Sequence, residues 1–379
     1  MFMHEGIGSF TLHALGNYHS ENLSVLEAIP HRMPLLTDLT FNISPNIEYI
    51  QPLLALTLQL TCLKSLALPP FPNYTSILPS LSGIRGLTSL HVMSAPHVKP
   101  VSQYEPIERA DYFSALTTIH IFCNYEVATK IFRGQIPHLS DVEVITPEYE
   151  KPSRIQSLLV DVARACPSIA RVSLTLKRGA SFSSSSQNDN LNTEHIRPIL
   201  TRKGITSFVL MHPNPMNLTL ADVEEIASSW PNIRHINLCS DPRLPCASNG
   251  IIECLTPRAL LSFARYCPYI VTLGLFLEAN FSSLPSNEEV DALSSGFKKL
   301  RVLSVGVSSI EDERLFASFL CHVLPQGCIV KYGSGWYDAD AGSVNAKRWQ
   351  LVNELLPILL SVRIRTIQRV ERSLTVKKE

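Results

Sequence analysis

Apolar residues recur along the chain in a short, fixed pattern. Ten six-residue blocks carry an aliphatic or aromatic side chain at positions 1, 4 and 6, and most have a polar residue between the last two. Alternation with a period of two predicts a strand that buries one face. Weaker copies are present in SFTLHAL near the start of the sequence and around residues 328–330. The blocks begin at Leu36, Leu63, Leu87, Leu116, Leu139, Ile169, Ile205, Ile233, Ile270 and Leu300.

The segments between the blocks have the period of a helix. Apolar residues within 155–166 follow the spacing i, i+3, i+4, i+7, i+8 and i+11, and TLADVEEIASSWPNI has a similar apolar face. Prolines in CPSI, WPNI and CPYI predict that a helix ends before each following strand. Helix starts are predicted by two capping-box spacings and by one Thr–Pro pair: Thr219 with Asp222, Ser286 with Glu289, and Thr256 before Pro257.

Strand and helix therefore alternate in units of 23–37 residues. Leucine-rich repeats combine a strand with a helix or 3₁₀ turn in about 20 to 29 residues, and the longer units here contain insertions. We predict an α/β leucine-rich-repeat solenoid of about 10–11 repeats, a horseshoe with a parallel sheet on the concave face and helices on the convex face. The alternative, a non-repetitive α/β protein, would need the block and the proline turn to recur by accident.

The repeats are expected to occupy residues 1–343. Residues 344–379 predict a helix, interrupted at Pro357, that caps the last repeat and ends in a basic tail. Docking of a partner on that basic end is the alternative. Long connections are expected at 94–112, 179–195 and 239–257, and the serine-rich one is interpreted as a flexible insertion or, alternatively, a phosphorylation site.

Charge and cysteine content bear on which classes of partner and which cellular compartment are expected. The chain has 33 basic and 33 acidic residues and a pI near 7.2, so it lacks the basic excess typical of nucleic-acid binders. We identify neither a secretory signal nor a membrane span. Nine cysteines without paired spacing predict reduced thiols and a cytoplasmic or nuclear protein.

No catalytic, phosphate-binding or zinc-binding motif is present, so we predict a protein that is not an enzyme and needs no cofactor. We expect a monomer that binds an unknown protein partner, without nucleic acid or membrane. Cys239, Cys246 and Cys254 lack the spacing of a metal site and are interpreted as buried or loop thiols.

The expected contact surface is the solvent-facing side of the strands. The column after block position 6 is apolar where water favours polar residues, which predicts either partner contact or cover by loops. A neighbouring column places His91, His120 and Glu143 on consecutive strands; a metal site is the alternative to ordinary exposed polar residues. The residues predicted to bind a partner are Met93, Phe122, Ile145, Met211, Phe276, His91 and His120.

The LxxLxL blocks with CPxI-type turns resemble the leucine-rich repeats of F-box proteins. The irregular spacing and the segments GSGWYDAD and RW look like the large fungal group of that family. The resemblance covers roughly residues 20 to 340. It implies that the repeats bind a substrate of a ubiquitin ligase, whereas coupling to a ligase adaptor would require the family's LPxELL-type helical motif. That motif is not seen, so we expect a shortened relative or an incomplete sequence. A free-standing interaction protein and a regulator of a GTPase are the alternatives.

Overall fold

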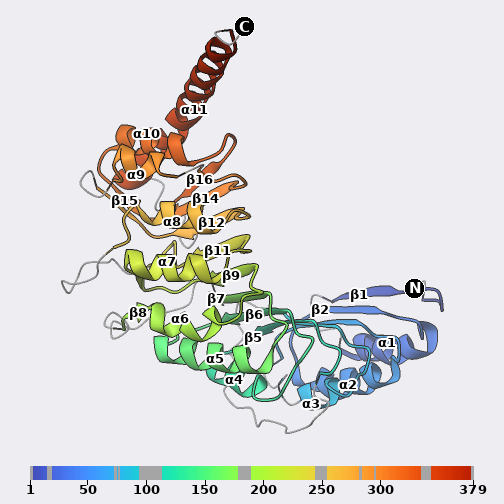
Figure 1. Cartoon of the computed structure of the whole chain (residues 1–379). Coiled ribbons are helices and arrows are strands. Elements are labelled where there is room, and N and C mark those ends of the chain that lie inside the picture. Colours follow the sequence, from blue (N-terminus) through green and yellow to red (C-terminus); the bar gives the residue numbers. More distant parts are fainter. Residues whose placement is uncertain are drawn as a thin grey trace. The chain divides into compact units, whose positions relative to one another are not determined.

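The computed structural model describes residues 3–14, 19–71, 75, 77–93, 113–177, 189–243, 254–280, 284–293, 296–333 and 343–376. Two compact units make up the chain: residues 1–186 with 195–202, and residues 187–194 with 203–379. Each unit alternates strands with helices along the sequence (Figure 1).

The first unit contains parallel strands in sequence order, with helices along one side of them (Figure 1). Within the described residues its strands are β1 (Ser9–Ala14), β2 (Asp38–Ile43), β3 (Ser65–Leu68), β4 (Ser89–Val92), β5 (Thr118–Phe122), β6 (Asp141–Thr146) and β7 (Arg171–Leu176). Its helices are α1 (His19–Arg32), the 3₁₀ turn η1 (Ile47–Tyr49), α2 (Ile50–Gln59), α3 (Leu78–Leu81), α4 (Tyr125–Ile131) and α5 (Pro152–Ala165). Helix α6 (Thr193–Leu200) begins in the second unit and ends in the first.

The second unit repeats this arrangement. Its main strands pair in parallel in the order β9 (Ser207–Leu210), β11 (His235–Leu238), β12 (Thr272–Leu275), β14 (Val302–Gly306) and β16 (Ile329–Tyr332). Two short parallel pairs join β8 (Leu191–Asn192) to β10 (Met216–Asn217) and β13 (Glu278–Ala279) to β15 (Ser309–Ile310). The helices are α7 (Leu220–Ser229), α8 (Ala259–Tyr266), α9 (Asn287–Asp291), α10 (Glu313–Val323) and α11 (Val344–Val376).

The predicted anchors form the core of both units. All three anchors in each of the ten blocks are at most 3% exposed. The block residues between positions 4 and 6 point to the other side of the sheet, because successive strand side chains alternate. The weak copies are also strands, β1 and β16. The prediction of a leucine-rich-repeat solenoid with parallel strands is therefore confirmed.

Most predicted helix boundaries are confirmed. Both capping boxes form, at Thr219 with Asp222 and at Ser286 with Glu289, because each side chain satisfies a backbone N–H that the first helical turn leaves free. Helices α5, α7 and α8 each end two residues before the predicted proline. The start predicted at Thr256 is wrong: Ala259 and Leu260 donate to the carbonyls three residues earlier, so a tighter turn precedes α8.

The carboxyl-terminal helix differs from its prediction at one point. Helix α11 continues through Pro357 without interruption. A proline removes one backbone donor, and Leu356 and Leu360, on either side of Pro357, are buried and hold this part of the helix in place. Side chains of its first half are buried as expected, namely Trp349, Val352, Leu356 and Leu360, while Leu359 is half-buried.

Several anchoring contacts hold α11 on the last strands. Trp349 Nε1 donates to the Ser308 carbonyl at 2.9 Å, and Asn353 Nδ2 donates to the Val330 carbonyl at 2.7 Å. The helix also packs along α10. These contacts fix the first half of α11 against the end of the second unit.

The predicted long connections lie largely outside the described residues. That is the case for 94–112, for most of 179–195 and for the centre of 239–257. The second of these predictions is wrong at its end, because β8 and the start of α6 lie within it.

Cysteine chemistry also differs at one position. Seven described cysteines are free, as expected, but Cys254 is disulfide-bonded, so the prediction of reduced thiols is wrong there. Cys246 lies outside the described residues. Among the described helices, none has both the length and the apolar character needed to cross a bilayer.

Candidate recognition surface

The two predicted histidines meet on the solvent-facing side of the first unit. Strand register pairs His91 of β4 with His120 of β5, and His120 with Glu143 of β6. Each of these side chains is half-buried. The ring centroids of His91 and His120 are 4.4 Å apart with the rings nearly perpendicular, so the column predicted from the sequence is a contact in the structure.

A second column completes a polar network with the histidines. His120 lies between two carboxylates: its Nε2 is 3.6 Å from Asp141 Oδ2 and its Nδ1 is 3.4 Å from Glu143 Oε2. Arg171 of β7 donates to Asp141 Oδ2 from Nε at 2.9 Å and from Nη2 at 2.7 Å. We call His91, His120, Asp141, Glu143 and Arg171 the polar network.

Sequence reasoning missed Asp141, Arg171 and also Ser89, whose Oγ is 2.6 Å from His91 Nε2. All three precede the second anchor of their block, so they share one face with the histidine column. A signal was present in the polar residues at this position of successive blocks, but only strand register places them side by side.

Burial and neighbouring charge shift two pKa values in this network. Burial and the nearby His120 lower the pKa of His91, with Asp141 opposing them. Burial alone would raise the pKa of Asp141, but hydrogen bonds from His120 and Arg171 and the charges of both outweigh it and lower that pKa. Asp141 therefore remains a negative charge at neutral pH, and the Arg171 guanidinium is oriented toward it.

The apolar column of the first unit is only partly accessible. Met93 and Ile145 are half-buried, but Phe122 is 1% exposed, so the expectation that Phe122 faces a partner is wrong. The chain turns away from the sheet directly after Phe122, because Asn124 caps α4 by accepting from Val127 N. Lys177 also lies over the Phe122 ring, with its Nζ 5.2 Å from the ring centroid.

The remaining predicted contact residues, Met211 and Phe276, belong to the second unit. They follow β9 and β12, and both are half-buried. Cys239, which follows the intervening strand β11, is 1% exposed and has a φ of 51°. These side chains therefore do not form an uninterrupted exposed stripe within this unit.

The network does not have the geometry of a metal centre or of a nucleophilic site. No group of three or more His, Cys, Asp or Glu side chains within the described ranges could hold a metal ion. Near the Ser89–His91 pair, backbone N–H groups are engaged in the parallel ladder, including Ser89 N, which donates to the Lys64 carbonyl at 3.0 Å. An oxyanion would need such donors free.

Comparison with known proteins does not identify a function for this surface. No family model and no curated protein matches the chain. A solved structure of the Rad7 and Elc1 complex from yeast resembles it. In that comparison the sequence identity is 12%, the TM-score is 0.35 and the match covers 87% of each chain. This likeness is too distant to assign a role to any residue.

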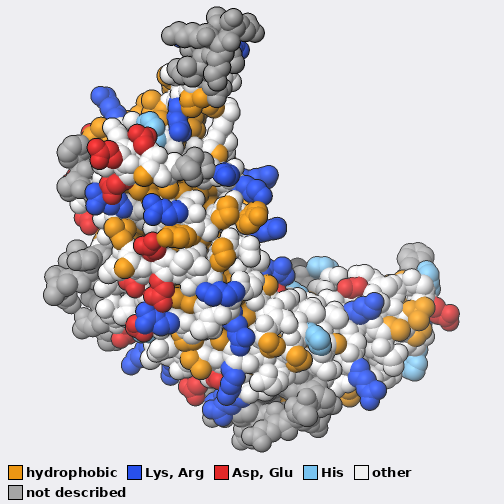
Figure 2. All heavy atoms as spheres, in the orientation of Figure 1, with side chains coloured by type: hydrophobic (Ala, Val, Ile, Leu, Met, Phe, Trp, Pro, Cys, Tyr) orange, Lys and Arg blue, Asp and Glu red, His pale blue; other side chains and the backbone are white. Residues whose placement is uncertain are grey.

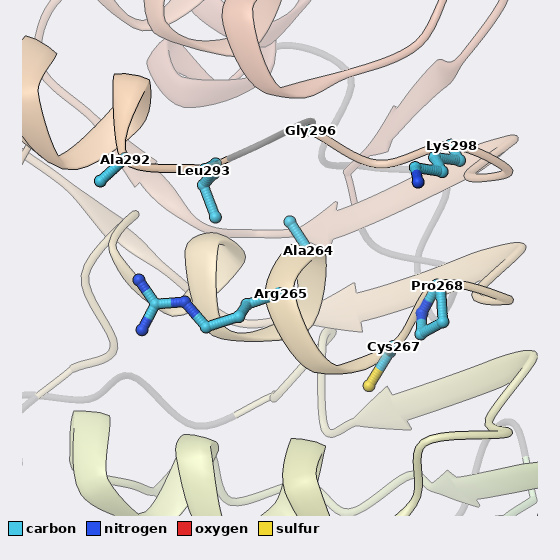
Figure 3. A pocket seen from close by; sticks show the side chains of 8 residues that line it. All are labelled: Ala264, Arg265, Cys267, Pro268, Ala292, Leu293, Gly296 and Lys298. Atoms are coloured by element: carbon cyan, nitrogen blue, oxygen red, sulfur yellow. The ribbon is translucent and has the colours of Figure 1, made fainter.

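Two hollows lie near the helices of the second unit. One has a volume of about 150 Å³ and is bordered by Arg265, Cys267 and Lys298 among others (Figure 3). Burial raises the pKa of the Cys267 thiol to about 12, so this cysteine is not an activated nucleophile. The other hollow, about 370 Å³, lies between α9 and α10 and includes Val290, Phe319 and His322.

Proposed function

We propose that the protein is a non-catalytic scaffold that recognises another protein through the solvent-facing side of β4 to β7. The observation that carries the proposal is the polar network flanked by half-buried Met93 and Ile145. Protein interfaces combine apolar contact with charge complementarity, and both kinds of side chain are available here.

Preorganisation supports this choice. The network side chains are positioned by one another and by the strand ladder before any partner arrives. Ordering side chains on binding costs about 0.5 to 1.5 kcal/mol for each flexible one, so a surface that is already ordered binds with a smaller entropic cost. The opposite charges of Asp141 and Arg171 also disfavour partners with the wrong charge pattern.

A binding role fits the chemistry better than catalysis does. The Ser89–His91 pair lacks nearby free backbone donors, and burial raises the pKa of Cys166 and of Cys239 to about 12. The thiolates needed for nucleophilic attack are therefore scarce at neutral pH.

The narrower proposal is that the partner is a substrate delivered to an F-box-type ubiquitin ligase, in the cytoplasm or nucleus. Its support is the resemblance of the repeats and their proline turns to that family. Affinity capture of the full chain followed by mass spectrometry tests it: a ligase adaptor and a cullin among the captured proteins support the ligase role. Stable partners without those subunits contradict it and favour a free-standing interaction protein.

The recognition surface itself is tested with two matched double variants in the first unit. Met93→Lys with Ile145→Lys changes the proposed surface, whereas Leu58→Lys with Val160→Lys changes side chains on α2 and α5 that are 56% and 47% exposed. The amount of captured partner protein should fall at least about ten-fold with the first variant and stay unchanged with the second. Equal capture by both variants would remove this surface as the binding site.

A further inference from the structure

One edge of the second unit carries charged side chains of a single sign. Five exposed cationic side chains precede its strands: Lys203, Arg234, Lys298, Lys299 and Arg301. Because the strands are parallel, their amino ends lie at one edge of the sheet. We call this set the basic edge. In Figure 2 the Lys and Arg side chains gather beside the strand ends labelled β12 and β14 in Figure 1.

The basic edge has no acidic counterpart nearby. The turns 201–207, 230–235, 267–272, 296–302 and 325–329 contain no Asp or Glu. No carboxylate in the described part of the chain forms an ion pair with any of the five cations. Acidic residues of this unit lie elsewhere, including Asp222 on α7, Glu288 on α9 and Glu278 on β13.

Separation of charge within a neutral chain marks a surface that attracts anions. The total charge is zero, so the basic edge does not follow from a general basic excess. Clustered charge of one sign produces a local potential that steers an oppositely charged partner toward it. In the first unit, by contrast, Arg171 at the start of β7 is paired with Asp141 on the adjacent strand.

The dimensions suit an extended peptide. The turns holding Lys203 and Lys298 precede β9 and β14, which are three strand spacings apart, or roughly 14 Å. An extended segment of about five residues covers that distance. Backbone register supports the alignment, because Arg234 N bonds to the Thr206 carbonyl and Arg301 N bonds to the Val271 carbonyl.

Nucleic acid fits this edge less well. Single strands bind basic grooves whose exposed aromatic rings stack on the bases. Tyr269 is the large exposed aromatic of this edge among the described residues, at 45% exposure, and Lys299 Nζ already lies 4.7 Å from its ring centroid. The ring is therefore occupied as a cation–π partner.

We infer that the basic edge binds an acidic, extended protein segment. This edge consists of other residues than the surface on β4 to β7, and its occupancy does not depend on the function proposed for that surface. The hollow of about 150 Å³ adjoins the edge at Lys298, one of the residues that line it (Figure 3).

Fluorescence anisotropy with the full-length protein and a labelled decaglutamate peptide tests the inference. Binding should weaken as the salt concentration rises, because exposed ion pairs are screened within about 10 Å at 0.1 M salt. The double variants Lys298→Glu with Arg301→Glu and Lys203→Glu with Arg234→Glu should each bind at least about ten-fold more weakly.

The matched control carries the same change of net charge elsewhere in the unit. Arg314→Glu with Lys347→Glu alters exposed residues on α10 and α11 and should keep affinity within about two-fold. An equal loss in the control, no binding of the peptide at low salt, or equal or tighter binding of a labelled thymidine decamer would each overturn the inference. Using two edge variants from different strands keeps the test valid if one of them fails to fold.

Discussion

Arg171 directs two nitrogen atoms of its guanidinium group onto one oxygen of Asp141 on the adjacent strand, at 2.9 and 2.7 Å. The same oxygen lies 3.6 Å from His120 Nε2. One carboxylate therefore links β5, β6 and β7 on the face available to a partner. This link connects the stability of the surface to pH.

Asp141→Asn should make the protein less sensitive to acid. The folded-state pKa of Asp141 is lowered from its ordinary value of 3.8, so its stabilising contribution is present above that value and is lost as pH falls through the folded pKa. Denaturant unfolding at neutral pH should show a loss on the order of 1 kcal/mol for the variant, because Arg171 is largely exposed and its charge is screened. Below about pH 4 the difference from the unmodified protein should shrink. A constant difference down to pH 2 would contradict this assignment.

His120→Gln should raise the pKa of His91. Burial is the largest cause that lowers the pKa of His91, the charge of His120 is the next, and Asp141 opposes both. Removing His120 leaves burial and Asp141, so the His91 value should move toward 6.5. The pKa of His91 is measured by proton NMR titration of its ring. An unchanged or lower pKa would mean that the two rings do not interact in solution.

The lowered pKa of His91 also predicts that stability falls as the pH drops below about 6.5. The ordinary pKa of histidine is 6.5, and the folded-state pKa of His91 is lower. As the pH falls below 6.5, the unfolded chain therefore binds a proton at His91 more readily than the folded chain does. The contribution of neutral His91 to stability is complete above pH 6.5 and is lost as the pH falls through the folded-state pKa. His91→Gln should therefore unfold with a weaker pH dependence in this window than the unmodified protein. Identical slopes in denaturant titrations would exclude His91 as a cause.

Leu174→Ala should destabilise the first unit by about 2 to 5 kcal/mol. Leu174 is a fully buried block anchor on β7, and its truncation leaves a cavity among rigid neighbours. Val160→Ala, on the exposed face of α5, should change stability by less than about 0.5 kcal/mol. Chemical denaturation followed by circular dichroism compares the two. A loss below about 1 kcal/mol for Leu174→Ala would contradict the inward orientation of the anchors.

Arg363→Ala should loosen the end of the terminal cap. Arg363 Nη1 donates to the carbonyls of Cys321 and His322, at 2.6 and 3.0 Å, in the last turn of α10. Those carbonyls lack helical partners and attract cations. Loss of the two hydrogen bonds from Arg363 should therefore lower the free energy of unfolding by about 1 to 2 kcal/mol. Arg365→Ala, an exposed neighbour, serves as the control and should be nearly neutral. Faster amide exchange confined to α10 and α11 in the first variant would locate the effect.

Local pattern was sufficient for the repeating part of the fold. The anchors from Leu36 to Val305 predicted the strands because burying one face of a strand demands alternation, and prolines such as Pro167 predicted the helix ends because proline cannot continue a helix. Both signals lie within a few residues of the feature they specify. The column of His91, His120 and Glu143 followed from the same alternation.

Contacts between distant segments decided the rest. Phe122 looked exposed in the pattern, but the turn at Asn124 and the cover by Lys177 bury it. The pairing of Asp141 with Arg171 depends on strand register, which brings together residues 30 positions apart. The sequence alone determined which side chains face inward, because the same pattern of buried anchors recurs in every repeat. Only the tertiary structure determined which outward side chains meet, because their partners come from other strands and turns whose positions no local pattern specifies.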